Sequence, residues 1–188
     1  MTALLAAADF HCPAIRLTGT VDYAMYNTFR AQFEAAPREG VIVIELSTLG
    51  GDPEVARMMG EDIRSASALE PDRHFVILGK AAIYSAGTTL MSFFARDNRY
   101  LTRGTRLMIH ERKLSKVLTI DGPLTACVAT VKATLHEIEA SIIIQNEGFE
   151  NLICGSRVTM DELLQRAPFN WYIEANEAVS LGLVRAVL

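Results

Sequence analysis

Short apolar runs of strand length alternate with helical patterns along most of this chain of 188 residues. The run at 41–46 (VIVIEL) is β-branched and apolar at successive positions, which is typical of a strand covered on both faces. Further strands are expected at 14–18, 75–78, 99–102 and 106–110. Strands that alternate with helices predict βαβ units with right-handed crossovers, so the indicated fold class is α/β with a mostly parallel sheet.

Two helices are expected directly after these strands. Asp52, Pro53 and Glu54 form a helix start, with a capping side chain, a proline at the first helical position and an acid in the first turn. The segment 85–95 (SAGTTLMSFFA) predicts a helix with almost no polar face, which must be deeply buried. The residues before it, 79–84, are expected to form a turn.

A third helix differs from the others in its length and in its apolar pattern. From Leu124 to Ile142 the apolar residues recur at alternating steps of four and three residues, which is a heptad-like stripe. A helix over 124–146 would be about 35 Å long at about 1.5 Å per residue, longer than a small domain needs. Two interpretations are open: the helix lies across its own core, or, as we favour, it projects as an arm that packs against another subunit.

Charge and composition exclude several classes of partner. The formal net charge is −4 and no block of lysine or arginine is present, so nucleic acid and anionic membranes are not expected ligands. No apolar run approaches the roughly 18–20 residues that cross a bilayer, and a cytoplasmic protein is predicted. Hydrophobic residues make up 50% of the chain, which suggests apolar surface buried between subunits. No metal-binding spacing or phosphate-binding loop is present, so neither metal nor cofactor is expected.

Residues that can carry chemistry follow three of the expected strands. Gly50 and Gly51 precede a helix start, where N–H groups favour negative charge, and they suit an oxyanion hole. Ser85 begins the buried helix, and His110 ends the strand at 106–110. Each signal is weak alone, because a Gly-Gly pair can be a plain turn, a serine can cap a helix and a histidine can be an ordinary buried residue. Together, a serine and a histidine at neighbouring strand ends form a nucleophile with its base.

Several stretches of the chain resemble a known family. LTG at 17–19, LSTLGGD at 46–52, AAIYSAG at 81–87 and RLMIHE at 106–111 occur in the order found in Clp-protease proteolytic subunits. The closing stretch at 177–188 (EAVSLGLVRAVL) is similar to the C-terminal segment of that family. From about residue 17 to its end, the chain therefore resembles a Clp-protease proteolytic subunit.

The resemblance implies a role for each residue at the strand ends. Ser85 would attack a peptide carbonyl, and His110 would take its proton and later give it to the leaving amine. Gly51 and Ala86 would supply the oxyanion-hole N–H groups, and Gly50 would shape the loop.

The resemblance also implies an architecture and partners. The fold would be crotonase-like, of the Clp-protease type, with repeated ββα units in one peptidase domain. Residues 14–112 and 165–188 would form its head, and 113–164 a protruding handle. The substrate would be a peptide or an unfolded protein, and the protein would be a homo-oligomer, a ring or stacked rings, built through the helix at 124–146.

The chain departs from the family pattern at the third member of the triad. Asn170 occupies the position where the family usually has an aspartate. An asparagine can orient an imidazole but cannot stabilise imidazolium by charge, and Asp→Asn lowers kcat by about 10⁴ in a serine protease template. Glu174 and Asp161 are alternative acids, without support from position.

Other departures concern partners and the handle. The segment before Leu17 is shorter than the family segment that helps dock an AAA+ unfoldase, which argues against such a partner. The sequence after His110, ERKLSK, lacks the glycines expected near the substrate-binding strand. The interval of 60 residues from His110 to Asn170 exceeds the family pattern, with the extra length in the handle.

Three functional hypotheses follow. The first is a serine endopeptidase that works inside an oligomeric chamber. The second is a catalytically degenerate ring subunit or scaffold, which Asn170 favours. The third is a crotonase-type enzyme acting on an acyl-CoA thioester, which would need a carboxylate base at the pocket. Only Glu111 and Asp52 lie near the strand ends, and this weakens the third hypothesis.

Overall fold

Two long parallel strands form the centre of the sheet in the computed structural model, which describes residue 5 and residues 10–188. β2 (Gly40–Thr48) and β3 (Arg73–Tyr84) pair in parallel from Gly40 opposite Arg73 to Leu46 opposite Gly79. β1 (Ile15–Thr18) pairs with β2 on one side, and β4 (Arg99–Leu101) and β7 (Ala186–Val187) follow β3 on the other. All of these pairs are parallel. The α/β class with a mostly parallel sheet is confirmed.

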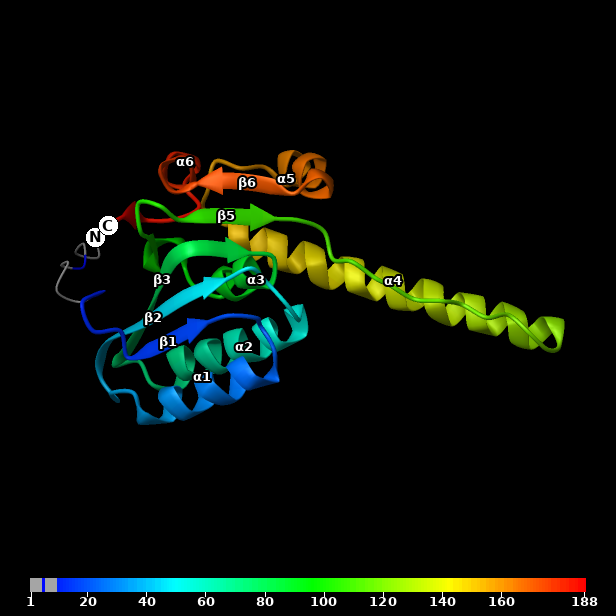
Figure 1. Cartoon of the computed structure of the whole chain (residues 1–188), viewed down its shortest axis with the longest axis horizontal. Helices are drawn as coiled ribbons and strands as arrows, with labels where there is room; N and C mark the ends of the chain where they lie inside the picture. Colours follow the sequence, from blue (N-terminus) through cyan, green and yellow to red (C-terminus); the bar gives the residue numbers. More distant parts are fainter. Residues whose placement is uncertain (1–4, 6–9) are drawn as a thin grey trace.

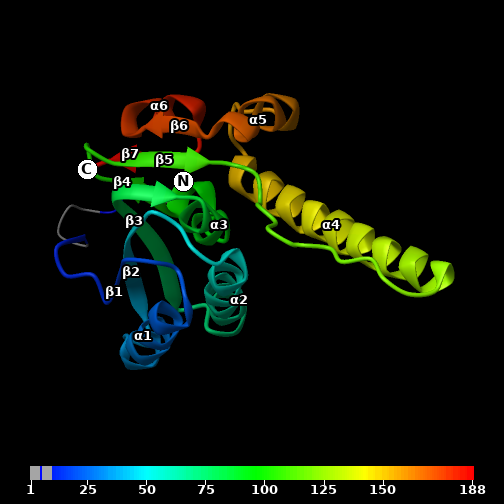
Figure 2. The ribbon, with the colours of Figure 1, turned by 45° about the vertical axis from the view of Figure 1, so that its right-hand side comes forward.

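Both faces of the central strands are covered, as the apolar run at 41–46 predicts. α1 (Tyr23–Ala35) and α2 (Pro53–Leu69) lie along one face (Figures 1 and 2). Alternate residues of β2 separate accordingly, with Ile42 and Ile44 in the main core beside the helices. Val43 belongs to a smaller cluster with Phe10 and Tyr100. This period-two separation follows from the geometry of a strand, whose side chains point to opposite faces in turn.

The start of α2 is the one expected from the sequence. The Asp52 side chain accepts hydrogen bonds from the amides of Glu54 (2.8 Å) and Val55 (3.4 Å), and Pro53 is the first helical residue. Because these amides have no partner within the helix, the cap fixes the point where the chain turns out of Gly50-Gly51.

The turn expected at 79–84 is wrong, because these residues continue β3. The strand bulges there, since Leu46 and Thr48 of β2 pair with Gly79 and Ile83, and Ala81 takes the left-handed conformation (φ 57°). At this bulge β3 changes its second neighbour from β4 to β5 (Arg106–Ile109). Glycine and alanine there favour a bulge as well as a turn, and the pairing with β5 decides between them.

The remaining elements extend the sheet and cover its end. β5 pairs with β3 in parallel and with β6 (Trp171–Glu174) in antiparallel fashion. The expected helix at 85–95 is shorter and begins one residue later, as the buried α3 (Ala86–Ser92). The other short elements are η2 (Arg96–Asn98), α5 (Met160–Arg166), η3 (Ala167–Phe169) and α6 (Ala175–Leu181).

α4 (Leu124–Ile153) is a helix of 30 residues that projects from the rest of the molecule (Figure 1). Its expected start is confirmed, and it runs seven residues beyond the expected end at 146. Only Phe149 and Leu152, near its C-terminal end, are buried. The segment 110–121, which runs outward from β5 along the helix towards its tip, has no helix or strand, and Lys116 within it pairs with Glu137 (Figure 1). We call α4 with this segment the arm.

The apolar stripe of α4 is exposed in this chain. Its large hydrophobic residues from Leu124 to Ile143 remain between 38% and 85% exposed. The alternative that the helix lies across its own core is therefore wrong, and packing of the arm against another subunit stays a prediction. Among the described residues, no helix is long and apolar enough to cross a membrane, and the cytoplasmic location also stays a prediction.

One buried arginine joins the base of the arm to the sheet. The side chain of Arg99, at the start of β4, is fully buried and has no carboxylate partner among the described residues. It donates instead to backbone carbonyls of α4 and of the segments around it: Ser92, Phe94, Asn151, Leu152 and Leu183, at 2.6–3.5 Å. Burial lowers the pKa of this guanidinium to about 10, so it stays charged at neutral pH.

Replacing Arg99 with methionine should lower the free energy of unfolding by about 3 kcal/mol or more, because five carbonyls lose their donor. Urea denaturation followed by circular dichroism measures this loss. Arg103→Met is the matched control, since Arg103 is exposed and its side chain makes no hydrogen bond within the described residues. A loss below about 1 kcal/mol for Arg99→Met would contradict the role given to this side chain.

Candidate active site

Ser85 stands at the junction between β3 and α3 in a strained backbone conformation. Its φ and ψ are 54° and −114°, a region that residues with a side chain rarely adopt. The Ser85 amide donates to the Met108 carbonyl of β5 (2.9 Å), and the Ser85 carbonyl accepts from Thr88. Its side chain does not cap α3. A sharp strand-to-helix turn of this kind presents a hydroxyl group at the end of a sheet, as in nucleophile elbows.

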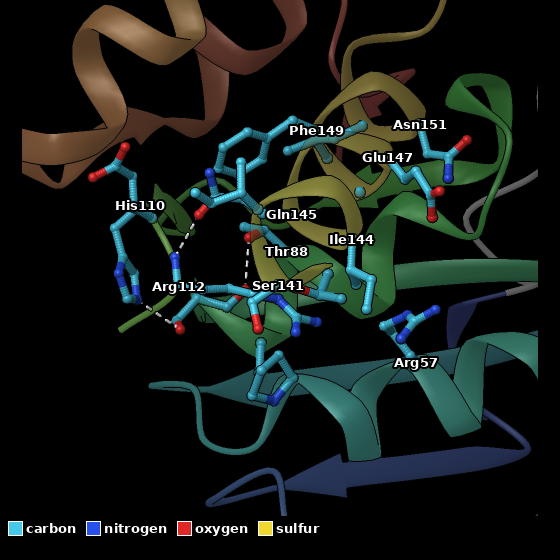
Figure 3. A pocket seen from close by; sticks show the side chains of 18 of the residues that line it. Arg57, Thr88, His110, Arg112, Ser141, Ile144, Gln145, Glu147, Phe149 and Asn151 are labelled. Atoms are coloured by element: carbon cyan, nitrogen blue, oxygen red, sulfur yellow. Dashed lines mark hydrogen bonds between the residues drawn. The ribbon is translucent and has the colours of Figure 1, made fainter. Parts of the chain in front are cut away.

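The hydroxyl group of Ser85 is hydrogen-bonded to His110. Its Oγ lies 2.7 Å from Nε2 of His110 (Figure 3). The pairing of β3 with β5, which ends with Tyr84 opposite Met108, places these two side chains at neighbouring strand ends. Both residues are half-buried. With the ring proton on Nδ1, Nε2 accepts the serine proton, which is the arrangement of a nucleophile with its base.

The surroundings of His110 favour its neutral form. Burial lowers the pKa of the imidazole, and the nearby Lys113 ammonium lowers it further, while the backbone and side chain of Glu111 partly oppose the shift. A neutral imidazole at neutral pH is able to accept a proton. Because the pKa is lowered, His110 keeps its neutral, proton-accepting form until the pH falls below the range in which histidine ordinarily titrates.

The other nitrogen of His110 is buried without a hydrogen-bond partner among the described residues. Asn170 makes no hydrogen bond to it, and its side chain is exposed. The antiparallel register of β5 and β6 ends with Ile109 opposite Trp171, the two residues next to His110 and Asn170. Asn170 has a left-handed backbone (φ 58°), a conformation that asparagine tolerates better than most residues.

Neither of the alternative acids, Glu174 and Asp161, lies where it could bond to His110. Glu174 is bonded to Arg106 (2.7 Å) at the far end of the same strand pair, and Asp161 is exposed in the first turn of α5. A buried acceptor without a hydrogen-bond partner among the described residues, Oδ1 of Asn146, lies on α4. The structure thus brings Ser85 and His110 together but does not join a third residue to them.

Gly50 and Gly51 fit tightly between Ser85 and the loop after β1. A methyl group at Gly50 (φ 113°) would lie 2.8 Å from Cβ of Ser85, and one at Gly51 (φ 148°) would lie 2.3 Å from the Val21 carbonyl oxygen. Only glycine fits both the space and the backbone here. Glycine at 50 thus allows the loop to approach Ser85, and glycine at 51 allows it to approach the backbone of Val21.

Two backbone amides beside Ser85 are free to donate. Within the described part of the chain, the N–H groups of Gly51 and Ala86 make no hydrogen bond. Both residues line the cavity that also contains Ser85 and His110. These are the donors expected from the sequence for an oxyanion hole. Gly50 is buried behind them, and its amide donates to Thr48 Oγ1 (3.0 Å).

The cavity beside Ser85 has a volume of about 550 Å³ and lies between α2, α3, α4 and the residues after His110. In Figure 3, His110 lies at one side of the view, and Arg57 and Glu147 at the other, with Arg112 and Gln145 between them. Sequence reasoning missed Arg57, Gln145 and Glu147, because they lie on helices that are distant along the chain from Ser85, and it assigned no role to Arg112. No group of His, Cys, Asp and Glu side chains among the described residues could hold a metal ion.

Comparison of the chain with protein-family models gave no match, and neither did comparison with curated proteins.

Replacing Gly50 with alanine should slow the reaction of Ser85 with a fluorophosphonate probe about a hundredfold, because the methyl group displaces Ser85. Gly122→Ala is a matched control, since Gly122 has the same φ of 113° but no neighbour within 4 Å of the added methyl group. Mass spectrometry of the labelled protein over time gives both rates. Equal rates in the two variants would contradict the tight fit.

Proposed function

We propose that this protein is a serine hydrolase that cleaves peptide bonds, with Ser85 as nucleophile and His110 as general base. The observation that carries the proposal is the 2.7 Å contact between Ser85 Oγ and His110 Nε2, at a serine held in a strained strand-to-helix turn. A serine that simply capped α3 would bond to the helix amides, and Ser85 does not.

The proposed reaction begins when Ser85 Oγ attacks the substrate carbonyl carbon and His110 Nε2 takes the hydroxyl proton. The carbonyl oxygen becomes an oxyanion, and the amides of Gly51 and Ala86 donate hydrogen bonds to it. The carbon–nitrogen bond then breaks as His110 gives its proton to the leaving amine. Water, activated by the same imidazole, hydrolyses the acyl-enzyme and restores the serine.

In this proposal Asn170 is the residue that orients His110. Support comes from the β5–β6 register, whose last pair, Ile109 opposite Trp171, directly adjoins His110 and Asn170, and from the buried Nδ1 group, which needs an acceptor. The amide oxygen of an asparagine can accept this proton after a rotation of the side chain, and it then fixes the tautomer in which Nε2 is free. Without a carboxylate the imidazolium is less stabilised, so the enzyme is expected to be slow.

The proposal includes the finer architecture that the sequence resemblance implies. The sheet, the turn at Ser85 and the projecting arm are compatible with a crotonase-like fold of the Clp-protease type. The exposed stripe of α4 supports a homo-oligomer that buries it, because an apolar patch of this length is unusual on a monomer. An unfolded protein or peptide would then be cleaved inside the assembly.

A fluorophosphonate probe tests the catalytic proposal, with Ser85→Ala as the control. Covalent labelling at Ser85 that disappears in the control, together with hydrolysis of a fluorogenic peptide by the unmodified chain only, is the expected result. An intact protein that takes up no label would overturn the proposal. It would favour the scaffold hypothesis, for which the unpartnered Nδ1 of His110 is the supporting observation.

Replacing Asn170 with aspartate should raise the labelling rate about tenfold or more, because a carboxylate stabilises the imidazolium of His110. The pH dependence should change as well. In the unmodified chain the rate should fall only below about pH 6.5, since burial lowers the pKa of His110 and the neutral base persists to lower pH. The new carboxylate would raise that pKa, so the fall should begin at higher pH.

Asn146→Asp is the control for this prediction, since Oδ1 of Asn146 is buried without a hydrogen-bond partner among the described residues. A pH profile that moves with Asn146→Asp and not with Asn170→Asp would assign the orienting role to α4 instead.

A further inference from the structure

The wall of the cavity beside Ser85 carries hydrogen-bond donors that no group of the described residues satisfies. Arg112 follows His110 by two residues, and its guanidinium makes one side-chain bond, to Glu54 (2.6 Å). Arg57 also makes one, to the other oxygen of the same carboxylate (2.7 Å). A guanidinium has five N–H donors, so most of the donors of both arginines remain free within the described residues.

One carboxylate shared by two guanidinium groups leaves one positive charge unbalanced at this place. Burial raises the pKa of Glu54, but the hydrogen bonds from Arg112 and Arg57 lower it by more, so this carboxylate stays ionised. The side chains of Arg57 and Arg112 are 32% and 21% exposed, which is much less than the 62% of Arg64 farther along α2. Partly buried charges are less screened by solvent, and they attract a ligand of opposite charge more strongly.

Gln145 adds oriented donors to the same wall. Its Oε1 accepts a hydrogen bond from the Arg112 amide (2.7 Å), and this contact fixes the side-chain amide, because only its oxygen can accept. Its Nε2 group has no acceptor within the described residues, and the side chain lines the cavity. In Figure 3, Gln145 and Arg112 lie between His110 and the far side of the cavity.

Two carboxylates of the cavity wall, those of Glu111 and Glu147, are poorly placed to neutralise the positive charge of the arginines. Glu111 and Glu147 line the cavity without an ion pair among the described residues, but both are exposed. Glu147 lies on the same side of the cavity as Arg57, away from His110, whereas Arg112 and Gln145 lie nearer to His110 (Figure 3). Lys113, beside His110, adds a further positive charge that has no ion-pair partner in the described part of the chain.

We infer that this cavity selects substrates with an acidic side chain, aspartate or glutamate, at the residue that supplies the carbonyl to Ser85. The substrate carboxylate would accept hydrogen bonds from Gln145 Nε2 and from the free guanidinium donors of Arg112, while the more distant Arg57 adds to the positive charge of the cavity. A large apolar side chain would leave these donors without acceptors when it displaced water from them. This inference rests on the proposed function and names the substrate class of the same site.

The test is the rate at which peptidyl phosphonates modify Ser85 when only the side chain next to the phosphorus atom differs. Probes with glutamate, glutamine, leucine, phenylalanine and lysine side chains are compared, beside a simple fluorophosphonate without a peptide. The glutamate probe should react at least about tenfold faster than the leucine probe, because a hydrogen bond to a charged group supplies a factor of this size. A leucine or phenylalanine probe that reacts as fast or faster overturns the inference.

Gln145→Glu is the most direct variant. The new side chain can still accept from the Arg112 amide, but it loses the two donors and places a negative charge in the cavity. The rate at which the glutamate probe modifies Ser85 should fall at least about tenfold, and the rate for the lysine probe should rise. Arg64→Gln is the matched control, because Arg64 lines the same cavity but is exposed and bonded to both oxygens of Glu61 (2.5 and 2.6 Å). Equal probe preferences in Gln145→Glu and Arg64→Gln also overturn the inference.

The simple fluorophosphonate separates this failure from failure of the proposed function. If it labels Ser85 while the acidic preference is missing, only the substrate class is wrong. If neither it nor any peptide probe labels Ser85 in a folded protein, the proposed function fails and the substrate class fails with it. Thermal unfolding of each variant shows that a slower rate does not reflect loss of the fold.

Discussion

Strand β3 is hydrogen-bonded to β2 along most of its length, to β4 through its middle and to β5 at its end. This arrangement is possible because the strand bulges at Ala81 and bends away from one neighbour towards the next. The bend delivers Ser85 to the end of β5, where its amide continues the ladder and its hydroxyl group meets His110. The glycine loop, the helix behind the serine and the histidine all take their positions from this one path.

The sequence predicted the elements whose signals are local. The apolar run of β2, the cap of α2 by Asp52 and the heptad stripe of α4 each follow from spacing and propensity alone, and each is found. The strand character of 79–84 was missed because it depends on pairing with β5, a segment more than twenty residues away. Its glycine and alanines carry turn and bulge signals equally, so the partner strand decides.

The candidate site shows the same division between local and distant information. Ser85, His110 and the two glycines are each next to a strand end, and strand ends meet at one edge of a parallel sheet, so their proximity could be predicted. The orientation of Asn170 could not, since it depends on the rotation of an exposed side chain. The charged wall of the cavity could not either, because Arg57, Arg112 and Gln145 are brought together only by the docking of α2 and α4.

The arm is supported at its base alone, and this sets how its stability is distributed. Phe149, Leu152 and the carbonyls bound by Arg99 hold its last turns, whereas the outer turns depend on helix propensity and on the neighbouring segment. Local opening should therefore be easiest at the outer end and become harder towards the base, as hydrogen exchange along the helix would record. Gln145 lies close to the firm end, so fluctuation of the tip leaves the cavity wall in place.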